Sequence, residues 1–214
     1  MLDYRLRGHE NLEKGFFEGD NTYGIPDIKP EHLNISTLST AVSFNIAMSS
    51  KAPETIGCHF FVPDYQFKRL WVSPDKYTAG MLKYKFVCAP DYSLYTDYPQ
   101  ALQIYNHYRK HWLAAYWQDK GQTVIPTIAW SDERSFDWCF DGEPKEATVA
   151  VSSVGTQVHK ESKRLFMLGF ERMIEELKPK EMLFYGDIPA DALQLIEQAK
   201  TSVCNIKAFH QRFG

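Results

Sequence analysis

The chain has 214 residues, of which 44% are hydrophobic and 24% charged, and this composition is typical of one globular domain with a full core. A net charge of −3 excludes the global basic field that holds many proteins on nucleic acid. We find neither an apolar leader segment nor the roughly 18 consecutive apolar residues of a membrane span. Four scattered cysteines predict buried, reduced thiols. We therefore expect a cytoplasmic protein with no membrane contact.

The first part of the chain is predicted to surround the core rather than to form it. Residues 1–40 are polar and rich in glycine and proline, so we expect an extended segment that wraps the domain. Strands are then predicted at 41–50 and 58–62. One or two short helices follow, with Ser73 as the N-cap and Pro74 at the first helical position.

The segment 83–187 is predicted to be the core and to carry the site. Its apolar runs end in polar corners, and amphipathic stretches of helical period separate most of them. The predicted strands of the second part of the chain are 85–89, 123–130, 147–154, 181–186 and 202–206, and the predicted helices are 99–120, 161–179 and 187–200.

This order of elements predicts the fold class. Strands that alternate with helices of crossover length pair mainly in parallel, with right-handed connections. Six or seven strands are too few for an eight-stranded barrel. We therefore predict a single α/β domain, residues 1–214, with a mainly parallel sheet flanked by helices, either an open sheet or an incomplete barrel.

Polar and aromatic residues follow the predicted strands, at the edge where ligands bind in parallel sheets. Such a set also arises in α/β proteins without a site, so its specificity is low. We predict one pocket with three catalytic carboxylates, Asp91, Asp132 and Asp141. The expected ligand-binding residues are Tyr92, Asn106, Arg109, Tyr116, Trp130, Ser131, Ser152, Gly155, Tyr185 and Gly186.

The long predicted helix carries an arginine inside its apolar stripe. Arg109, with Asn106 beside it, falls between apolar positions on the helical wheel. A buried arginine must meet a carboxylate, a backbone carbonyl or a bound anion. The alternatives are therefore an internal ion pair and a phosphate clamp. His107, Lys110 and His111 lie off the centre of the stripe, and we expect no special role for them. The candidate ion-pair partners of the arginine are Asp91, Asp97, Asp132, Asp137 and Asp141.

Few motifs fix a particular chemistry. Residues 152–156 (SSVGT) end a strand shortly before a helix, which suits either an ordinary turn or a phosphate nest. The sequence has no Walker loop, no dinucleotide-binding glycine motif, no H-E-x-x-H and no nucleophile elbow. The acidic residues between 132 and 143 suit Mg²⁺, but a solvated loop explains them as well. We assign no metal ligand and leave the cofactor open, with Mg²⁺ as the candidate.

Several ordered motifs resemble a known family. They are N-x-x-R-x-x-W-x-A-A-Y-W-Q from Asn106, then V-I-P-T-I-A-W-S, S-F-D-W-C-F-D-G-x-P, V-A-V-S-S-V-G and a late Y-G. Over roughly residues 86–186 the chain resembles domain-of-unknown-function family 4417, a family of phage and bacterial proteins. The family's Arg-Ala-Tyr signature is replaced by Leu113-Ala114-Ala115-Tyr116, so its arginine is either displaced to Arg109 or absent. The resemblance implies a phage or mobile-element setting and no particular activity.

Two hypotheses for function follow. The first is an enzyme, a hydrolase or transferase that acts on a nucleotide-like or phosphate-bearing small molecule or on a nucleic-acid end. The second is a non-catalytic protein that docks on a host or replication protein, as a defence antagonist or a replication accessory. The polar strand ends and aromatic rings favour the first, and the missing catalytic motifs and acidic pI favour the second. A deep polar pocket would support the enzyme, and a flat apolar patch would support the docking protein.

Overall fold

The computed structural model describes residues 10–38 and 40–207, and its strands all pair in parallel. One sheet has the order β1-β2-β3-β4 and the other β5-β6-β7. A parallel bridge between Thr127 and Ala150 joins the two sheets, so spatial order follows chain order throughout. The predicted α/β fold with a mainly parallel sheet is confirmed. The strands are β1 (Ala41–Ser43), β2 (Gly57–His59), β3 (Phe86–Cys88), β4 (Val124–Ile125), β5 (Thr148–Ser152), β6 (Glu181–Tyr185) and β7 (Ser202–Ile206).

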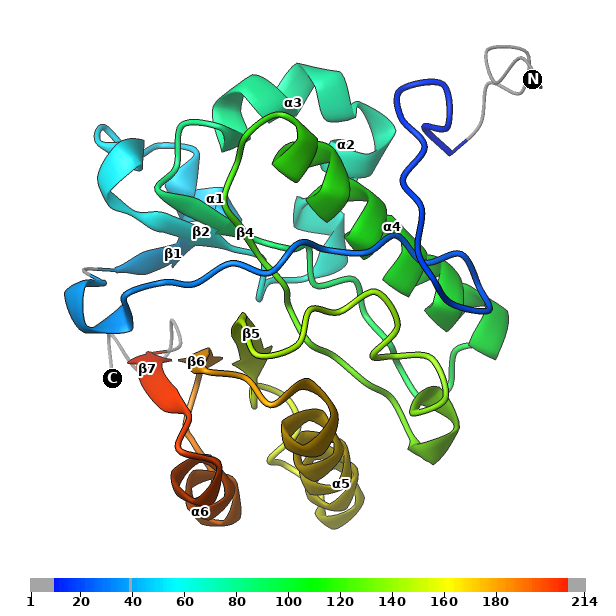
Figure 1. Ribbon diagram of the computed structural model, residues 1–214, viewed down its shortest axis with the longest axis vertical. Coiled ribbons are helices and arrows are strands. Elements are labelled where there is room, and N and C mark those ends of the chain that lie inside the picture. The colour runs from blue at the N-terminus through cyan, green and yellow to red at the C-terminus, as the bar shows by residue number, and fades with distance from the viewer. Residues whose placement is uncertain (1–9, 39, 208–214) are drawn as a thin grey trace.

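The helices cover the outside of the strands in two groups. In Figure 1 one group of helices lies beside the first sheet, and the other lies on the opposite side of the molecule beside the second sheet. The first group is α1 (Phe44–Ala47), α2 (Lys68–Val72), α3 (Pro74–Met81) and α4 (Gln100–Asp119). The second group is α5 (Lys160–Leu177) and α6 (Ala190–Ala199). No helix within the described ranges is both long enough and apolar enough to cross a membrane.

The strands curve around a shared interior. The ring of Tyr185, at the end of β6, lies 4.6 Å from the ring of His59 on β2 and 5.1 Å from that of Phe61, centroid to centroid. Since β3, β4 and β5 stand between these strands in the pairing order, the contact requires a curled surface. In the described part of the chain β1 and β7 do not pair with each other, so the barrel stays incomplete.

Because the strands are buried on both faces, their sequences are continuous runs of apolar residues. On β6, Leu183 and Tyr185 belong to the inner core cluster, while Met182 and Phe184 belong to the outer cluster against α5 and α6. Val87 likewise packs outward, under the helices of the first group, between two inward neighbours. One inner and two outer cores therefore result from simple alternation along the strands.

The segment before β1 crosses the amino edge of the strands. The carbonyl of Glu31 accepts a hydrogen bond from the backbone N–H of Thr148, the first residue of β5, at 2.8 Å. The hydroxyl of Thr148 in turn accepts the N–H of Leu33. Further back, Trp112 of α4 donates its indole N–H to the carbonyl of Gly15 at 3.0 Å. These contacts leave the carboxyl edge of the strands uncovered by this segment.

Several predicted elements differ in extent from the observed ones. The strand expected at 41–50 ends at Ser43, because Phe44 and Ala47 are both buried at the three-residue spacing of a helix face. The strand expected at 123–130 is reduced to β4 and the bridge at Thr127, since Pro126 between them has no N–H to donate to a ladder. The last helix starts after Pro189.

Candidate functional site

A pocket of about 520 Å³ opens at the carboxyl edge of the strands. Its walls come from the residues that follow β2, β3, β4 and β5 and from the first turns of α5. This is the edge where parallel α/β folds bind ligands. Five of the residues predicted from the sequence line it, namely Asp91, Trp130, Ser131, Ser152 and Gly155.

Aromatic and aliphatic side chains form one side of the pocket. Trp130 packs against Phe166 of α5, with ring centroids 5.6 Å apart, and its indole N–H donates to the carbonyl of Leu165 at 3.1 Å. Gly169 makes this packing feasible, because a Cβ there would lie 2.3 Å from the indole nitrogen. The Trp130 ring is therefore held on α5 as a fixed wall, suited to a planar group.

Asp91 is the one carboxylate among the lining residues. It follows β3 after Ala89 and Pro90 and is half-buried. Burial raises the pKa of Asp91 to about 7, with Lys110 opposing the rise and Asp64 adding to it. No residue in the described ranges donates a hydrogen bond to this carboxyl. A carboxyl of such pKa in a pocket can both take and give a proton near neutral pH, which is the property of a general acid–base group.

The rest of the polar lining is uncharged. Ser131 has a buried hydroxyl with no hydrogen-bond partner among the described residues, while the hydroxyl of Ser152 accepts the N–H of Val154. No lysine, arginine or histidine of the described chain lines the pocket. Hydroxyl groups of this kind suit a ligand with its own hydroxyl or amide groups. The lining residues with a hydroxyl are Ser93, Tyr95, Thr96, Ser131, Ser152, Thr156 and Ser162.

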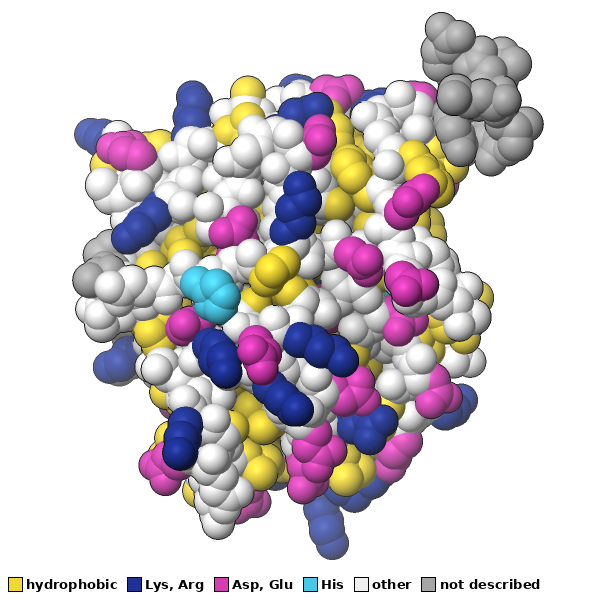
Figure 2. Space-filling view, viewed as in Figure 1, with side chains coloured by type: hydrophobic (Ala, Val, Ile, Leu, Met, Phe, Trp, Pro, Cys, Tyr) yellow, Lys and Arg dark blue, Asp and Glu magenta, His cyan; other side chains and the backbone are white. Residues whose placement is uncertain are grey.

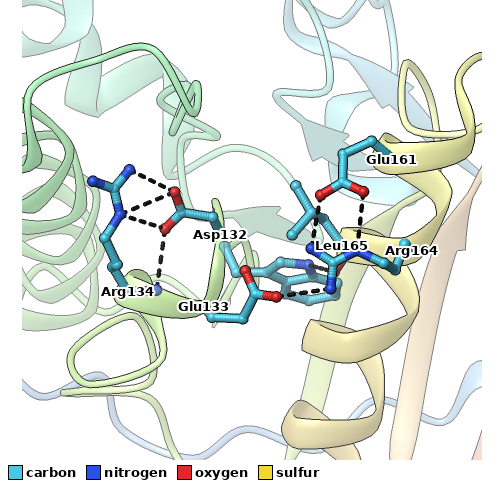
Figure 3. Close-up of polar contacts among 7 residues, drawn as sticks. Asp132, Glu133, Arg134, Glu161, Arg164 and Leu165 are labelled. Carbon is cyan, nitrogen blue, oxygen red and sulfur yellow. Dashed lines mark hydrogen bonds and ion pairs between the residues drawn. The ribbon is translucent and has the colours of Figure 1, made fainter.

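Ion pairs near the mouth of the pocket join the loop after β4 to α5 (Figure 3). Arg164 of α5 lies 2.7 Å from a carboxylate oxygen of Glu133, in the short 3-10 helix Glu133–Ser135, and 2.7 Å from one of Glu161. Asp132 binds Arg134, with a shortest N···O distance of 2.6 Å, and hydrogen bonds from Arg134 hold the pKa of Asp132 below its ordinary value. Asp132, predicted as a catalytic carboxylate, does not line the pocket.

Three other predicted residues lie near the pocket without lining it. Asp141 is beside the buried histidines of α4, and burial raises the pKa of its carboxyl. Tyr185 points into the strand interior, where it stacks on Phe61, itself a lining residue. Gly186 donates its N–H to the carbonyl of Ile206. These three residues therefore do not line the pocket with Asp91, because the side chain of Tyr185 belongs to the inner core and Asp141 is beside α4.

Arg109 and Asn106 of α4 and Tyr92 after β3 form a layer behind the pocket, which none of the three lines, whereas Tyr116 lies elsewhere on α4. The guanidinium of Arg109 lies 4.0 Å from the ring centroid of Tyr92 and 2.5 Å from Oδ1 of Asn106. Asn106 donates in turn to the carbonyl of Ser93 at 2.7 Å. Tyr116 donates to the carboxylate of Asp75. Within the described chain Arg109 forms no ion pair with a carboxylate, and two aromatic rings and an amide surround its guanidinium instead.

Sequence reasoning missed a buried polar cluster under α4, formed by His107, Lys110, His111 and Glu143. Their side chains are almost wholly shielded from solvent. Lys110 Nζ lies 2.5 Å from Glu143 Oε1 and donates to the carbonyl of Thr127 at 2.8 Å. The expectation that these positions need no explanation is wrong. The signal that could have found them is the i, i+4 spacing of two histidines on one helix.

Electrostatics in the cluster follow from burial and mutual contact. Burial lowers the pKa of His107, and the charge of Lys110 lowers it further. Burial raises the pKa of Glu143, but Lys110 and His111 together outweigh burial and hold this pKa below its ordinary value. The carboxylate is therefore ionised and paired, unlike Asp91.

Fold and site together define an α/β protein with a pocket at the carboxyl edge of parallel strands. The chain belongs to the family described as Domain of unknown function (DUF4417), whose model matches residues 17–203. The predicted resemblance is therefore confirmed, and the match includes both the pocket and the buried cluster.

Curated relatives come from bacteriophages. The chain is 36% identical over 172 residues to the Gene 1 protein of Mycobacterium phage L5, covering 80% of this chain and 75% of that protein. It is 35% identical over 172 residues to the Gene 1 protein of Mycobacterium phage D29, covering 79% of this chain and 63% of that protein. The match thus spans less than two thirds of the D29 protein. No solved structure matches the chain.

Proposed function

We propose that the protein is an enzyme, a hydrolase or transferase, that acts on a small nucleotide-like molecule in the pocket with Asp91 as its acid–base group. The observation that carries the proposal is the environment of Asp91. Its carboxyl, with a pKa raised to about 7, lines a cavity of about 520 Å³. Ligand pockets of this size with few polar groups and a perturbed titratable residue are the usual setting of catalysis.

The walls support a substrate with a planar ring and hydroxyl groups. Trp130 and Phe61 offer ring faces, and the lining serines and threonines offer hydroxyls to a sugar. A phosphate of the substrate would lie at Gly155 and Ser162, where α5 begins, because a helix N-terminus attracts anions. The uncharged lining makes the ring and sugar, rather than the phosphate, the main binding groups.

Asp91 would act on the proton of the attacking hydroxyl or water. In the ionised form it takes that proton, and in the protonated form it gives one to the leaving group. With a single carboxylate in the lining, Mg²⁺ at this place would need oxygen ligands from the substrate. Mg²⁺ therefore belongs to the test as an added component.

The proposed setting is the cytoplasm of a phage-infected cell. The relatives are phage proteins. All four cysteines are free, and three are buried, which suits a reducing compartment.

The alternative of a docking protein has less support on the face shown in Figure 2. Acidic and basic side chains are intermingled there, and hydrophobic side chains appear in small groups. A concave site at the carboxyl edge favours a small ligand over a flat protein contact.

The test is a thermal-shift screen with nucleosides, nucleotides and sugars, with and without Mg²⁺, followed by chromatography of the reaction products. We expect the parent and the rim variant Asp132→Asn to bind and turn over the same compound. Asp91→Asn should bind it and lose most of the turnover. If no compound binds, or if Asp91→Asn reacts at the parent rate, the proposal is wrong and the docking hypothesis leads.

A further inference from the structure

We propose that His107, His111 and Glu143 bind one first-row divalent cation, with Zn²⁺ as the first candidate. The two histidines stand one helical turn apart on α4, and Glu143 comes from the segment before β5. One ligand atom from each of the three side chains lies within 4.8 Å of the others. This set is separate from the pocket, which none of the three lines.

Backbone carbonyls select the tautomer of both histidines. His107 Nε2 lies 3.0 Å from the carbonyl oxygen of Asp141, and His111 Nδ1 lies 2.8 Å from that of Pro26. A carbonyl oxygen only accepts hydrogen bonds, so these two nitrogens carry the protons. In the neutral rings, His107 Nδ1 and His111 Nε2 then hold the lone pairs. Histidines that bind metals are commonly oriented by such carbonyls.

Two atoms of the cluster are buried without a hydrogen-bond partner in the described part of the chain, His107 Nδ1 and Glu143 Oε2. A third atom, His111 Nε2, faces Glu143 Oε1 at 3.1 Å, so a neutral ring would set a lone pair against a carboxylate. A proton on His111 would relieve only this contact. A cation would give a partner to all three atoms.

Lys110 leaves one oxygen of Glu143 for the cation. Its ammonium lies 2.5 Å from Oε1 and also donates to the Thr127 carbonyl, so Oε1 keeps Lys110 and Oε2 is left for the metal. The positive charge of Lys110 opposes cation binding. The ionised carboxylate of Glu143, in contact with the ammonium, offsets that charge.

The donor set indicates the class of ion. Two imidazoles and one carboxylate suit Zn²⁺ or Fe²⁺, whereas Mg²⁺ and Ca²⁺ prefer oxygen ligands alone. Because the site is buried and lies outside the pocket, the ion would tie α4 to the segment before β5. We therefore assign it a structural role, with folding coupled to metal binding.

The experiment uses the full chain, stripped with a chelator and dialysed against Zn²⁺, Fe²⁺ under anaerobic conditions, or Mg²⁺. We expect one Zn²⁺ or Fe²⁺ per chain by elemental analysis, a higher melting temperature, and little effect of Mg²⁺. His107→Gln and Glu143→Gln should lose the bound ion. His159→Gln, at an exposed position, and Asp91→Asn should keep it.

Two spectroscopic measurements and one further variant distinguish loss of the metal site from loss of folding. Near-UV circular dichroism shows whether each variant is folded, and His107→Cys, which retains a donor, should recover part of the binding. Co²⁺ in the parent should give the visible absorption of a low-coordinate nitrogen and oxygen site. Absence of stoichiometric binding, or binding that survives both ligand variants, would overturn the proposal. Either result leaves the pocket assay with Asp91→Asn unaffected, so the two proposals fail separately.

Discussion

The pocket and the cluster under α4 use similar side chains in opposite ways. In the pocket, Asp91 faces the cavity and accepts no hydrogen bond from the described chain, and burial raises its pKa to about 7. In the cluster, Glu143 is more deeply buried but has Lys110 and His111 beside it, and its pKa stays low. Partners, rather than depth, therefore decide whether a buried carboxylate keeps its charge. Asp91 in the pocket can therefore exchange a proton near neutral pH, whereas Glu143 in the cluster keeps its charge.

Lys110 is the residue that connects the two regions. Its ammonium binds Glu143 and the carbonyl of Thr127, and its charge also lowers the pKa of Asp91. A substitution of Lys110 is therefore expected to change the pKa of Asp91 in the pocket as well as the pairing of Glu143 in the cluster.

The largest effect is expected from Lys110→Met. In metal-free protein the variant leaves the buried carboxylate of Glu143 without its cation, and breaking a buried pair typically costs about 3–5 kcal/mol. Urea denaturation in the presence of a chelator measures the loss in free energy of unfolding. The double variant Lys110→Met/Glu143→Gln removes both charges and should recover part of it. If the double variant is as unstable as the single one, the cluster is not held by this pair.

Asp91→Asn tests whether the carboxyl in the pocket, unlike that of Glu143, destabilises the fold when it is ionised. Because the folded-state pKa of Asp91 is raised to about 7, the folded protein binds an extra proton between about pH 4 and pH 7. The contribution of Asp91 to stability is thus present at low pH and is lost as the pH rises through 7. At pH 8 the variant should be more stable than the parent by roughly 1–3 kcal/mol, the usual cost of a buried polar group without a partner.

The control variant is Asp132→Asn, because the stability contribution of Asp132 depends on pH in the opposite direction. The pKa of Asp132 is lowered by Arg134, so its contribution is present above its unfolded pKa and is lost as the pH falls through the folded value. Denaturation of both variants from about pH 2 to about pH 8 distinguishes them, because the contribution of Asp132 changes only below about pH 4. A stability difference between Asp91→Asn and the parent that does not change with pH would contradict the assignment.

Gly169→Ala tests whether the pocket wall is fixed. A Cβ at this position would lie 2.3 Å from the Trp130 indole nitrogen, so the ring must move, at a cost of roughly 1–3 kcal/mol. The matched control is Gly80→Ala on α3, where no atom lies within 4 Å and helix propensity should add about 0.5–1 kcal/mol. Thermal unfolding compares the two. Equal stabilisation by both substitutions would show that Trp130 is free to move.

The sequence predicted the fold and part of the pocket for the same physical reason. Continuous apolar runs identify strands buried on both faces, and parallel strands bring their carboxyl ends to one edge. Asp91, Trp130 and Ser152 were found in this way and line one cavity. Tyr185 also follows a strand, yet the direction in which the curled strands turn its side chain is a property of curvature, which no local pattern encodes.

The cluster under α4 was missed because its partners are distant in the chain. His111 acquires its role from the carbonyl of Pro26 and from Glu143, 85 and 32 residues away. A helical wheel ranks positions by the apolarity of their neighbours on the same helix, so it cannot register such contacts. Asp132 lies outside the pocket for a more local reason, because its carboxylate pairs with Arg134, two residues later in the chain.

The smallest effect is expected from Arg109→Leu, and it separates the pocket from the layer behind it. The guanidinium lies 4.0 Å from the ring centroid of Tyr92 and 5.0 Å from that of Tyr105, and it donates to Asn106. Loss of the cation–π contact should cost about 1 kcal/mol, because leucine keeps the apolar packing of the arginine stem. Arg109→Lys should fall between leucine and the parent, since an ammonium lacks the planar face that lies over the rings. Urea denaturation gives the stabilities, and the thermal-shift screen gives ligand binding, which we expect to be unchanged because Arg109 does not line the pocket. If Arg109→Leu lost ligand binding at parental stability, the phosphate-clamp hypothesis would be right, and the uncharged pocket would not be the whole binding site.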